Sequence, residues 1–305
     1  MPIHRFTLTP RSPYSLALTA IRFARFKDEN VDRVETGRYQ RLLCVDGQLA
    51  LATVTAEGTT AKPLLRVELQ GSRKTDLDRP EFAAQLRHIL GMDLDLKPFY
   101  RLARKDELLA SMVTRFHGLK FAVSPTLFEA LVMAVLSQQV NLTFAYSIKK
   151  ELVETFGDKL SVNGETYHAF PEPEQFAGET EESLQRFRLS RAKAGTLIRL
   201  GQAFASGVLT QEELTALPDE DVVERLMQIK GIGRWSAEVA LMRGLARPDA
   251  FPAGDLGVVK YVAQGLLGKT ERATEADMRA FAERWRPYRG LALIYCYAEL
   301  LMRRT

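Results

Sequence analysis

The pattern of apolar residues changes once along the chain, and this change limits the fold more than any other feature. In the first 75 residues, short apolar and β-branched runs are separated by turn pairs, which is typical of strands. From Ser124 to the end, apolar residues recur three and four positions apart, as on one face of a helix. We therefore predict an α+β protein in which a small antiparallel sheet domain with helices precedes an all-α body.

The first part of the chain contains a clear hairpin. Residues 39–45 and 48–55 are joined by Asp46-Gly47, a pair that readily adopts the positive φ angles of a two-residue turn. A further strand is predicted over Leu64–Leu69, and a helix over Tyr14–Phe26 is expected to pack on the sheet.

The helical part is predicted to begin with Ser124 as its N-cap and Pro125 as its first helical residue. The acidic segment that runs to Pro173 is expected to be a loop. The apolar periodicity predicts helices from Arg79 onward and over residues 142–156, 184–205, 220–229, 234–243 and 256–267. We place the domain boundary at residue 105, so that residues 1–105 form the sheet domain. Residues 106–305 form the helical region, with two helical subdomains that flank a cleft.

Composition narrows the class of protein. With 305 residues, 46% of them apolar, the chain can bury two or three ordinary cores. The net charge of +4 permits a polyanionic partner without requiring one. The two cysteines, Cys44 and Cys296, exclude a zinc site of paired cysteines, a four-cysteine iron–sulfur cluster and a disulfide framework. No apolar run reaches 18 residues, so we expect a soluble cytoplasmic protein without a membrane partner.

A tight turn, Gly231-Ile232-Gly233, separates two short predicted helices within residues 219–244. The first backbone N–H groups of the second helix have no acceptor in that helix and lie at the positive end of its dipole, so they suit a phosphate oxygen. A plain turn between two helices is the alternative. A Pro/Gly-rich loop over residues 248–254 then leads to Asp255, which is either a helix N-cap or a functional carboxylate.

These residues resemble a known family. Residues 231–237 and 251–255 are similar to the hairpin, loop and aspartate signature of the helix-hairpin-helix DNA glycosylases, and within them to the bacterial 3-methyladenine DNA glycosylase II type. Residues 128–140, 189–194 and 283–289 also resemble segments of this family. The resemblance implies a DNA repair enzyme that flips an alkylated base out of double-stranded DNA and hydrolyses its N-glycosidic bond. We expect such an enzyme to act as a monomer.

The resemblance assigns Asp255 as the catalytic carboxylate, which stabilises the sugar cation or positions the attacking water. Trp235 occupies the position at which strand-cleaving relatives have a lysine nucleophile, which favours a monofunctional enzyme. Trp235 and Tyr297 match walls of the base pocket. Val239 and Leu256 stand where relatives have further aromatic residues, so the range of damaged bases stays open.

The remaining assignments concern DNA binding. The family pattern places the phosphate contacts at Gly231, Gly233, Arg234 and Ser236, and a structural monovalent cation at the backbone carbonyls of Met227, Ile229 and Ile232. It places Phe121 as the wedge that fills the gap left by the flipped base, with burial in the core as the alternative. No other cofactor is expected. A non-catalytic DNA-binding module and a bifunctional glycosylase/lyase are the alternative functions.

Overall fold

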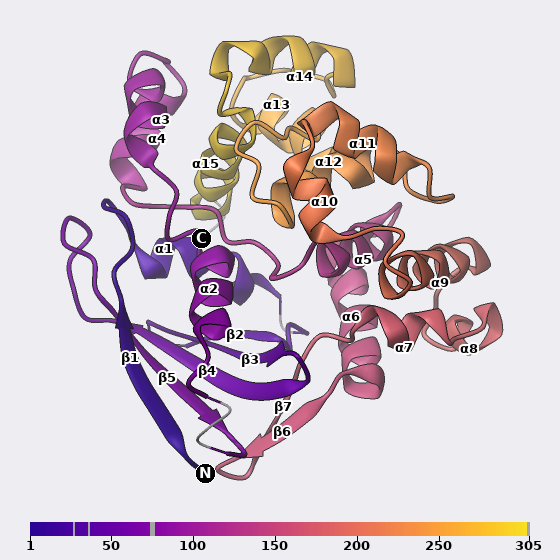
Figure 1. Ribbon diagram of the computed structural model, residues 1–305. Coiled ribbons are helices and arrows are strands. Elements are labelled where there is room, and N and C mark those ends of the chain that lie inside the picture. Colours follow the sequence, from indigo (N-terminus) through magenta and orange to yellow (C-terminus); the bar gives the residue numbers. More distant parts are fainter. Residues whose placement is uncertain (27, 36, 74–76, 304–305) are drawn as a thin grey trace.

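The first domain is built on one antiparallel sheet (Figure 1). The computed structural model describes residues 1–26, 28–35, 37–73 and 77–303. The sheet has the strand order β1-β5-β4-β3-β2, and every neighbouring pair is antiparallel. The strands are β1 Ile3–Leu8, β2 Asp32–Glu35, β3 Arg38–Val45, β4 Gln48–Ala56 and β5 Leu65–Gly71. The predicted antiparallel sheet domain at the start of the chain is therefore confirmed.

The turn between β3 and β4 has the predicted geometry. Val45 pairs with Gln48, and the two residues between them, Asp46 and Gly47, have φ angles of +47° and +71°. Two positive φ angles in succession define the type I′ turn that suits the twist of a hairpin. Strands β1 and β2 were not predicted, because half of the residues in β1 are polar and β2 has only four residues.

Each face of the sheet is covered by different elements. Helix α1 (Leu16–Ala20), the 3-10 turn η1 (Phe23–Arg25) and helix α2 (Pro80–Ile89) enclose the main core of this domain on one face. A second hairpin, β6 (Lys159–Val162) and β7 (Glu165–His168), packs Leu160 and Tyr167 against Leu42 and Leu51 on the other face.

Two predictions for these covering elements were wrong. The helix expected over Tyr14–Phe26 is divided into α1 and η1. The acidic segment expected to be a loop contains β6, β7 and the short helix α7. Its strands are stabilised by packing on the sheet, a tertiary contact that the local composition does not reveal.

The helical body contains the larger core, which surrounds α5 and α15. Its elements are α3 Leu96–Ala103, α4 Leu109–Arg115, α5 Leu127–Ser137, α6 Leu142–Phe156, α7 Pro173–Ala177, α8 Glu181–Gln185, α9 Arg191–Ala205, α10 Gln211–Ala216, α11 Asp219–Met227, α12 Arg234–Arg243, the π-helical segment η3 Gly257–Val262, α13 Ala263–Gly265, α14 Glu275–Ala282, η4 Glu283–Trp285 and α15 Arg289–Met302. Helix α3 shares this core, and the division at residue 105 stays a prediction.

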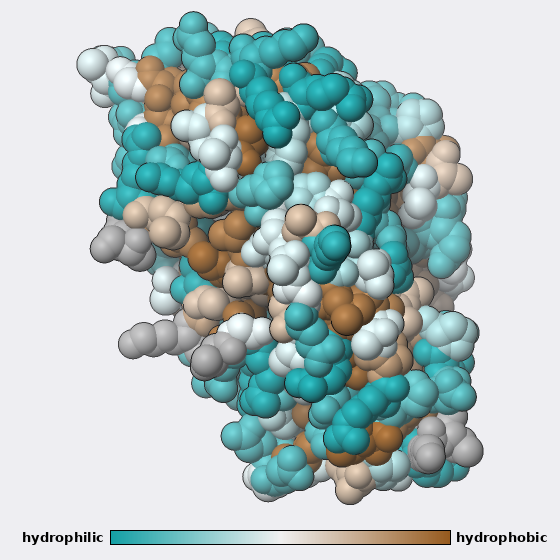
Figure 2. Space-filling model, turned by 90° about the vertical axis from the view of Figure 1, so that its left-hand side faces the viewer, coloured by the Kyte–Doolittle hydropathy of each residue, from teal (hydrophilic) through white to brown (hydrophobic). Residues whose placement is uncertain are grey.

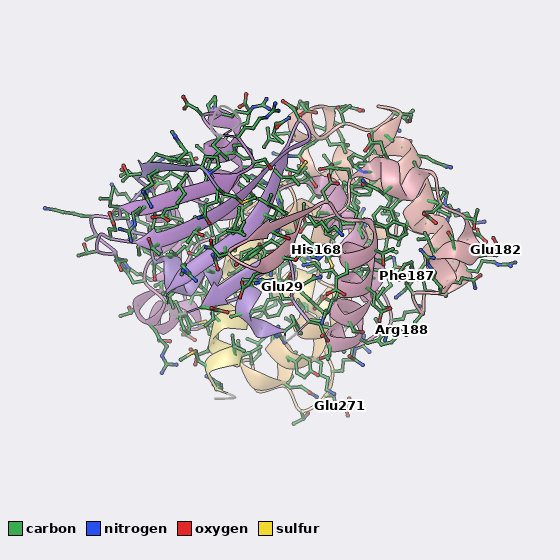
Figure 3. All side chains as sticks on the ribbon, turned by 90° about the horizontal axis from the view of Figure 1, so that it is seen from below. Glu29, His168, Glu182, Phe187, Arg188 and Glu271 are labelled. Carbon is green, nitrogen blue, oxygen red and sulfur yellow. The ribbon has the colours of Figure 1, made fainter. Side chains whose placement is uncertain are left out.

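Two helix boundaries differ from the predicted ones. The N-cap of α5 is Thr126, whose hydroxyl accepts a hydrogen bond from Glu129 N at 3.1 Å, and Ser124 lies before the helix. The helix expected over residues 184–205 is broken between α8 and α9, where Arg188 has a φ of +62°. Arg188 forms an ion pair with Glu151 of α6, and Figure 3 shows Phe187 and Arg188 beside each other at this break.

A buried network of charges joins the sheet to the helical body. Arg41 of β3 forms ion pairs with Asp32 of β2 and Glu129 of α5, and all three side chains are at most 5% exposed. Lys149 of α6 forms a second buried ion pair with Glu29, which Figure 3 labels between the strands and the helices. Burial alone would raise the pKa of Asp32, but the charges of Arg41 and Lys149 outweigh it and hold that pKa below its usual value.

The surface shows no single apolar face in the view of Figure 2, where apolar side chains form separate patches among hydrophilic ones. Within the part of the chain that the structure describes, no helix combines the length and the apolar character that a membrane crossing requires.

Candidate active site

The turn between α11 and α12 depends on a glycine. Gly231 has a φ of +104°, and a Cβ atom added to it would lie 1.9 Å from Oγ1 of Thr196 on α9. Gly233 has an ordinary φ of −99° and open space where its Cβ would be. Ile232 between them is buried at 5% exposed. At Gly231, close contact with α9 leaves no room for a side chain. At Gly233, there is open space for one.

Side chains from two other helices hold the carbonyl groups of this turn. Lys230 O accepts from Thr196 Oγ1 at 3.3 Å and from Arg199 Nε at 3.1 Å. Gln138, which follows α5, donates from Nε2 to Gly231 O and to Ser236 Oγ, both at 3.0 Å. These contacts orient the start of α12, where no side chain caps the first N–H groups. The helix start is thus available for an anion.

The predicted phosphate contacts lie in different settings. Gly231, Gly233 and Arg234 are exposed, whereas Ser236 is 1% exposed. The guanidinium of Arg234 is paired with Glu220 of α11 and, at 3.6 Å, with Glu238 of α12. Its charge is therefore balanced within the hairpin, whereas the first backbone N–H groups of α12 have no side-chain cap.

Asp255 accepts three hydrogen bonds from separate parts of the chain. Its Oδ2 accepts from Trp235 Nε1 of α12 at 2.9 Å. Its Oδ1 accepts from the Tyr297 hydroxyl of α15 at 3.0 Å and from Gly257 N at 2.7 Å. The last bond is a local turn contact, so the carboxylate organises the start of η3 and also meets two predicted pocket residues. Such donors fix the orientation of a carboxylate.

The hydroxyl of Tyr297 keeps its proton in this setting. Burial, followed by the charge of Asp255, raises the pKa of Tyr297 well above its usual value. Tyr297 therefore acts as a donor to the carboxylate at neutral pH.

Sequence reasoning missed Gly257. A Cβ atom at this position would lie 2.7 Å from both Asp255 Oδ1 and the Tyr297 hydroxyl oxygen. Gly257 also begins a π-helical segment, a geometry that is frequent at functional sites. The only sequence signal was a glycine two residues after the aspartate, which is too common to point to a site.

The other two predicted pocket residues, Leu256 and Val239, differ in exposure. Leu256 is 51% exposed and directly follows Asp255. Val239 is half-buried on α12, one turn beyond Trp235. Because residues four apart share a helix face, Trp235 and Val239 lie along one side of α12.

The structure corrects the assignment of Phe121. Its side chain is 1% exposed and belongs to the core of the helical body, so core burial, the alternative, is what the structure shows. Sequence reasoning missed Gln139, which is exposed and has a φ of +55° in the loop between α5 and α6. It directly follows Gln138, which contacts the hairpin. A positive φ at a residue other than glycine stores strain and is frequent at functional sites.

The sequence of the chain matches known families and a known protein. The HhH-GPD superfamily of base excision DNA repair proteins matches residues 132–287, and the AlkA N-terminal domain matches residues 5–124. A DNA-3-methyladenine glycosylase of Bacillus subtilis is 32% identical over 277 residues, which cover 90% of each chain.

Solved structures show the same relationship. A 3-methyladenine DNA glycosylase from Archaeoglobus fulgidus has a TM-score of 0.84 at 26% identity, with 98% of this chain and 99% of that chain covered. The 3-methyladenine DNA glycosylase Mag1 of Schizosaccharomyces pombe, in complex with abasic DNA, has a TM-score of 0.54 at 28% identity and covers 66% of this chain and 95% of its own. The resemblance seen in the sequence is confirmed: the chain belongs to the HhH-GPD superfamily of base excision DNA repair proteins.

Proposed function

We propose that this base excision repair glycosylase flips alkylated purines, of the 3-methyladenine type, out of double-stranded DNA and hydrolyses their N-glycosidic bond as a monofunctional enzyme. The observation that carries the proposal is the carboxylate of Asp255, which is held by Trp235 and Tyr297 from two helices. A plain N-cap needs only a local backbone donor such as Gly257 N.

The chemistry follows from charge. As the base departs, C1′ of the sugar gains positive charge, and a fixed carboxylate beside it stabilises this transition state. Asp255 also accepts the proton of the water that attacks C1′. An alkylated purine already carries positive charge, so it leaves without a strong general acid. Trp235 has no amine, so the enzyme forms no covalent imine there.

In this proposal, the hairpin binds the DNA backbone. The exposed N–H groups at the start of α12 receive a phosphate oxygen, with Gly231 and Gly233 allowing the backbone to approach closely. We propose that the exposed loop at Gln139, rather than Phe121, enters the stack of bases beside the flipped base. We propose that one molecule acts on one duplex.

We propose that a monovalent cation binds at the C-terminal end of α11. The carbonyl groups of Met227, Ile229 and Ile232 belong to the C-terminal end of this helix and to the turn, where the helix dipole is negative. Ile229 O accepts from Ile232 N at 3.0 Å, which brings two of these residues together. A bound ion would add positive charge beside the phosphate, and the role of the chain is to orient these carbonyls.

A product assay tests the proposed function. The protein is incubated with randomly methylated duplex DNA, and the released bases are separated and identified. We expect 3-methyladenine among the free bases and no covalent protein–DNA adduct after treatment with borohydride.

The outcomes separate the alternatives. DNA binding without any released base would show a non-catalytic binding module. A borohydride-trapped adduct would show a bifunctional glycosylase/lyase and would contradict the role given to Trp235.

A further inference from the structure

A chain of ion pairs runs from the hairpin to helix α14. Arg279 of α14 pairs with Glu238 of α12 at 3.0 Å and with Glu275 of its own helix at 2.8 Å. At the other end, Arg234 pairs with Glu220 of α11 and, at 3.6 Å, with Glu238. Glu238 is therefore the carboxylate that the two guanidinium groups share.

Glu238 is the most buried of these five residues. Its side chain is 7% exposed, whereas the side chains of the other four are 34% to 60% exposed. Burial raises the pKa of Glu238 above its usual value, although the charges of Arg279 and Arg234 oppose the rise. A buried ion pair is often no more stabilising than apolar side chains of the same size, but it holds its partners in one relative position.

The start of α14 contacts the chain on both sides of Asp255. Before the aspartate, Glu275 lies against Gly254, because a Cβ atom added to this glycine would be 2.8 Å from Glu275 Oε2. After it, Ala273 N donates to Val259 O of η3 at 2.9 Å, and Ala273 lies two residues before α14 begins. The position of α14 therefore sets the position of the segment that carries Asp255.

Helix α12 contacts the same aspartate through its indole donor. Trp235 donates to Asp255 Oδ2 at 2.9 Å, and Glu238 follows Trp235 by three residues on this helix. Residues three apart are neighbours on a helix surface. The ion pair between Glu238 and Arg279 thus joins the two helices that contact the segment of Asp255.

We propose that Glu238 is a positioning residue for the reaction at Asp255. Its carboxylate joins α12 to α14 and so holds Asp255 at a fixed distance from Trp235 and from the hairpin. This inference rests on the proposed function, and Glu238 acts in it through Arg279 rather than by touching the substrate. A misplacement of about 1 Å at a reacting group can lower a rate about a hundredfold.

The charge of this chain of ion pairs has a separate effect on DNA binding. Three carboxylates and two guanidinium groups leave one negative charge in excess beside the start of α12. This charge repels the phosphate that the hairpin receives in the proposed function. Loss of one carboxylate should therefore keep or raise the affinity for DNA, whereas loss of positioning should lower the rate of base release.

The variant Glu238→Met removes the shared carboxylate and keeps about the same side-chain volume. Both guanidinium groups retain a second carboxylate, Arg279 that of Glu275 and Arg234 that of Glu220, so no charge is left without a partner. Glu220→Met is the matched control, because it removes a carboxylate from the exposed end of the chain of ion pairs, away from α14.

The test measures two quantities for each protein: the single-turnover rate of 3-methyladenine release at saturating enzyme, and the affinity for an undamaged duplex. We expect Glu238→Met to lower the rate about tenfold or more, with an affinity equal to or higher than that of the parent. Glu238→Gln, which keeps an acceptor for Arg279, should lower the rate less. Glu220→Met should keep the parent rate.

The other outcomes would overturn the inference or the proposed function. A parent rate in Glu238→Met, or an equal fall of the rate in Glu238→Met and Glu220→Met, would overturn the inference. A lower rate together with weaker DNA binding and a lower melting temperature would show a purely structural role and would overturn it as well. A parent protein that releases no base would overturn the proposed function itself.

Discussion

The carboxylate of Asp255 is oriented by donors that come from three different places in the chain. Trp235 and Tyr297 lie on α12 and α15, and Gly257 N lies on the segment that follows the aspartate. Since each donor belongs to a buried or half-buried element, the carboxylate has little freedom to turn. This fixed orientation is what stabilisation of a short-lived sugar cation requires.

We expect Trp235→Phe to reduce the rate of base release. The change keeps an aromatic ring and removes only the indole N–H that donates to Oδ2. A hydrogen bond to a charged acceptor contributes about 1.5–3 kcal/mol, so the single-turnover rate should fall about tenfold to a hundredfold. Tyr297→Phe, which removes the donor to Oδ1, should act similarly. Unchanged rates in both variants would show that these donors do not position the carboxylate.

The sequence predicted part of this site and could not predict the rest. The family resemblance indicated Asp255, Trp235 and Tyr297, and the structure brings the three together. The close approach at Gly257 depends on how distant elements pack, and the spacing of residues along one element does not reveal it. The prediction of Phe121 as the wedge was wrong for the same reason. Nothing in the local sequence shows whether an aromatic ring in a loop is buried or exposed.

The hairpin of α11 and α12 is held from outside by α9 and by the end of α5. Thr196 and Arg199 fix the carbonyl of Lys230, and Gln138 fixes that of Gly231. The turn of the hairpin is therefore held in one conformation by its neighbours, and its two glycines differ in their surroundings.

Substitution of each glycine by alanine should show which of the two is needed for stability and which only for DNA binding. Gly231→Ala places a Cβ 1.9 Å from Thr196 Oγ1 at a positive φ, so we expect a lower melting temperature and weaker DNA binding. Gly233→Ala meets no atom within 4 Å, so it should melt like the parent. If Gly233 faces phosphate, this second variant should still bind DNA more weakly. Equal melting temperatures for all three proteins would contradict the account of Gly231.

The elements whose bounds were predicted correctly have residues at their ends that favour the start or the end of a helix. Helix α6 matches the predicted residues 142–156, with Asn141 as its cap and Gly157 after its end, and α12 matches residues 234–243. Elements that depend on distant partners were missed, as with β6 and β7, whose apolar residues pack on the sheet. The break at Arg188 was missed because no glycine or proline marks it.

The two domains are joined through buried charge as well as apolar contact. Arg41 of the sheet reaches Glu129 of α5, and Lys149 of α6 reaches Glu29. Removal of one member would leave an opposite charge buried without a partner, which is strongly destabilising. The network therefore fixes the sheet domain against the helical body.

We expect Arg41→Met to lower the free energy of unfolding by about 3–5 kcal/mol, because Asp32 and Glu129 would lose their buried partner. Arg5→Met removes an ion pair whose arginine is 60% exposed, and should change it by about 1 kcal/mol or less. Urea unfolding followed by circular dichroism measures both. Equal effects of the two substitutions would argue that the buried network does not join the domains.

The most direct test of the whole account is the rate of base release by Asp255→Asn. The variant keeps the size of the side chain and removes its negative charge. In single-turnover reactions on methylated duplex DNA, we expect release of 3-methyladenine to fall at least about a hundredfold, with the affinity for the duplex little changed. A variant that releases the base at close to the parent rate would contradict the assignment of Asp255 as the catalytic carboxylate.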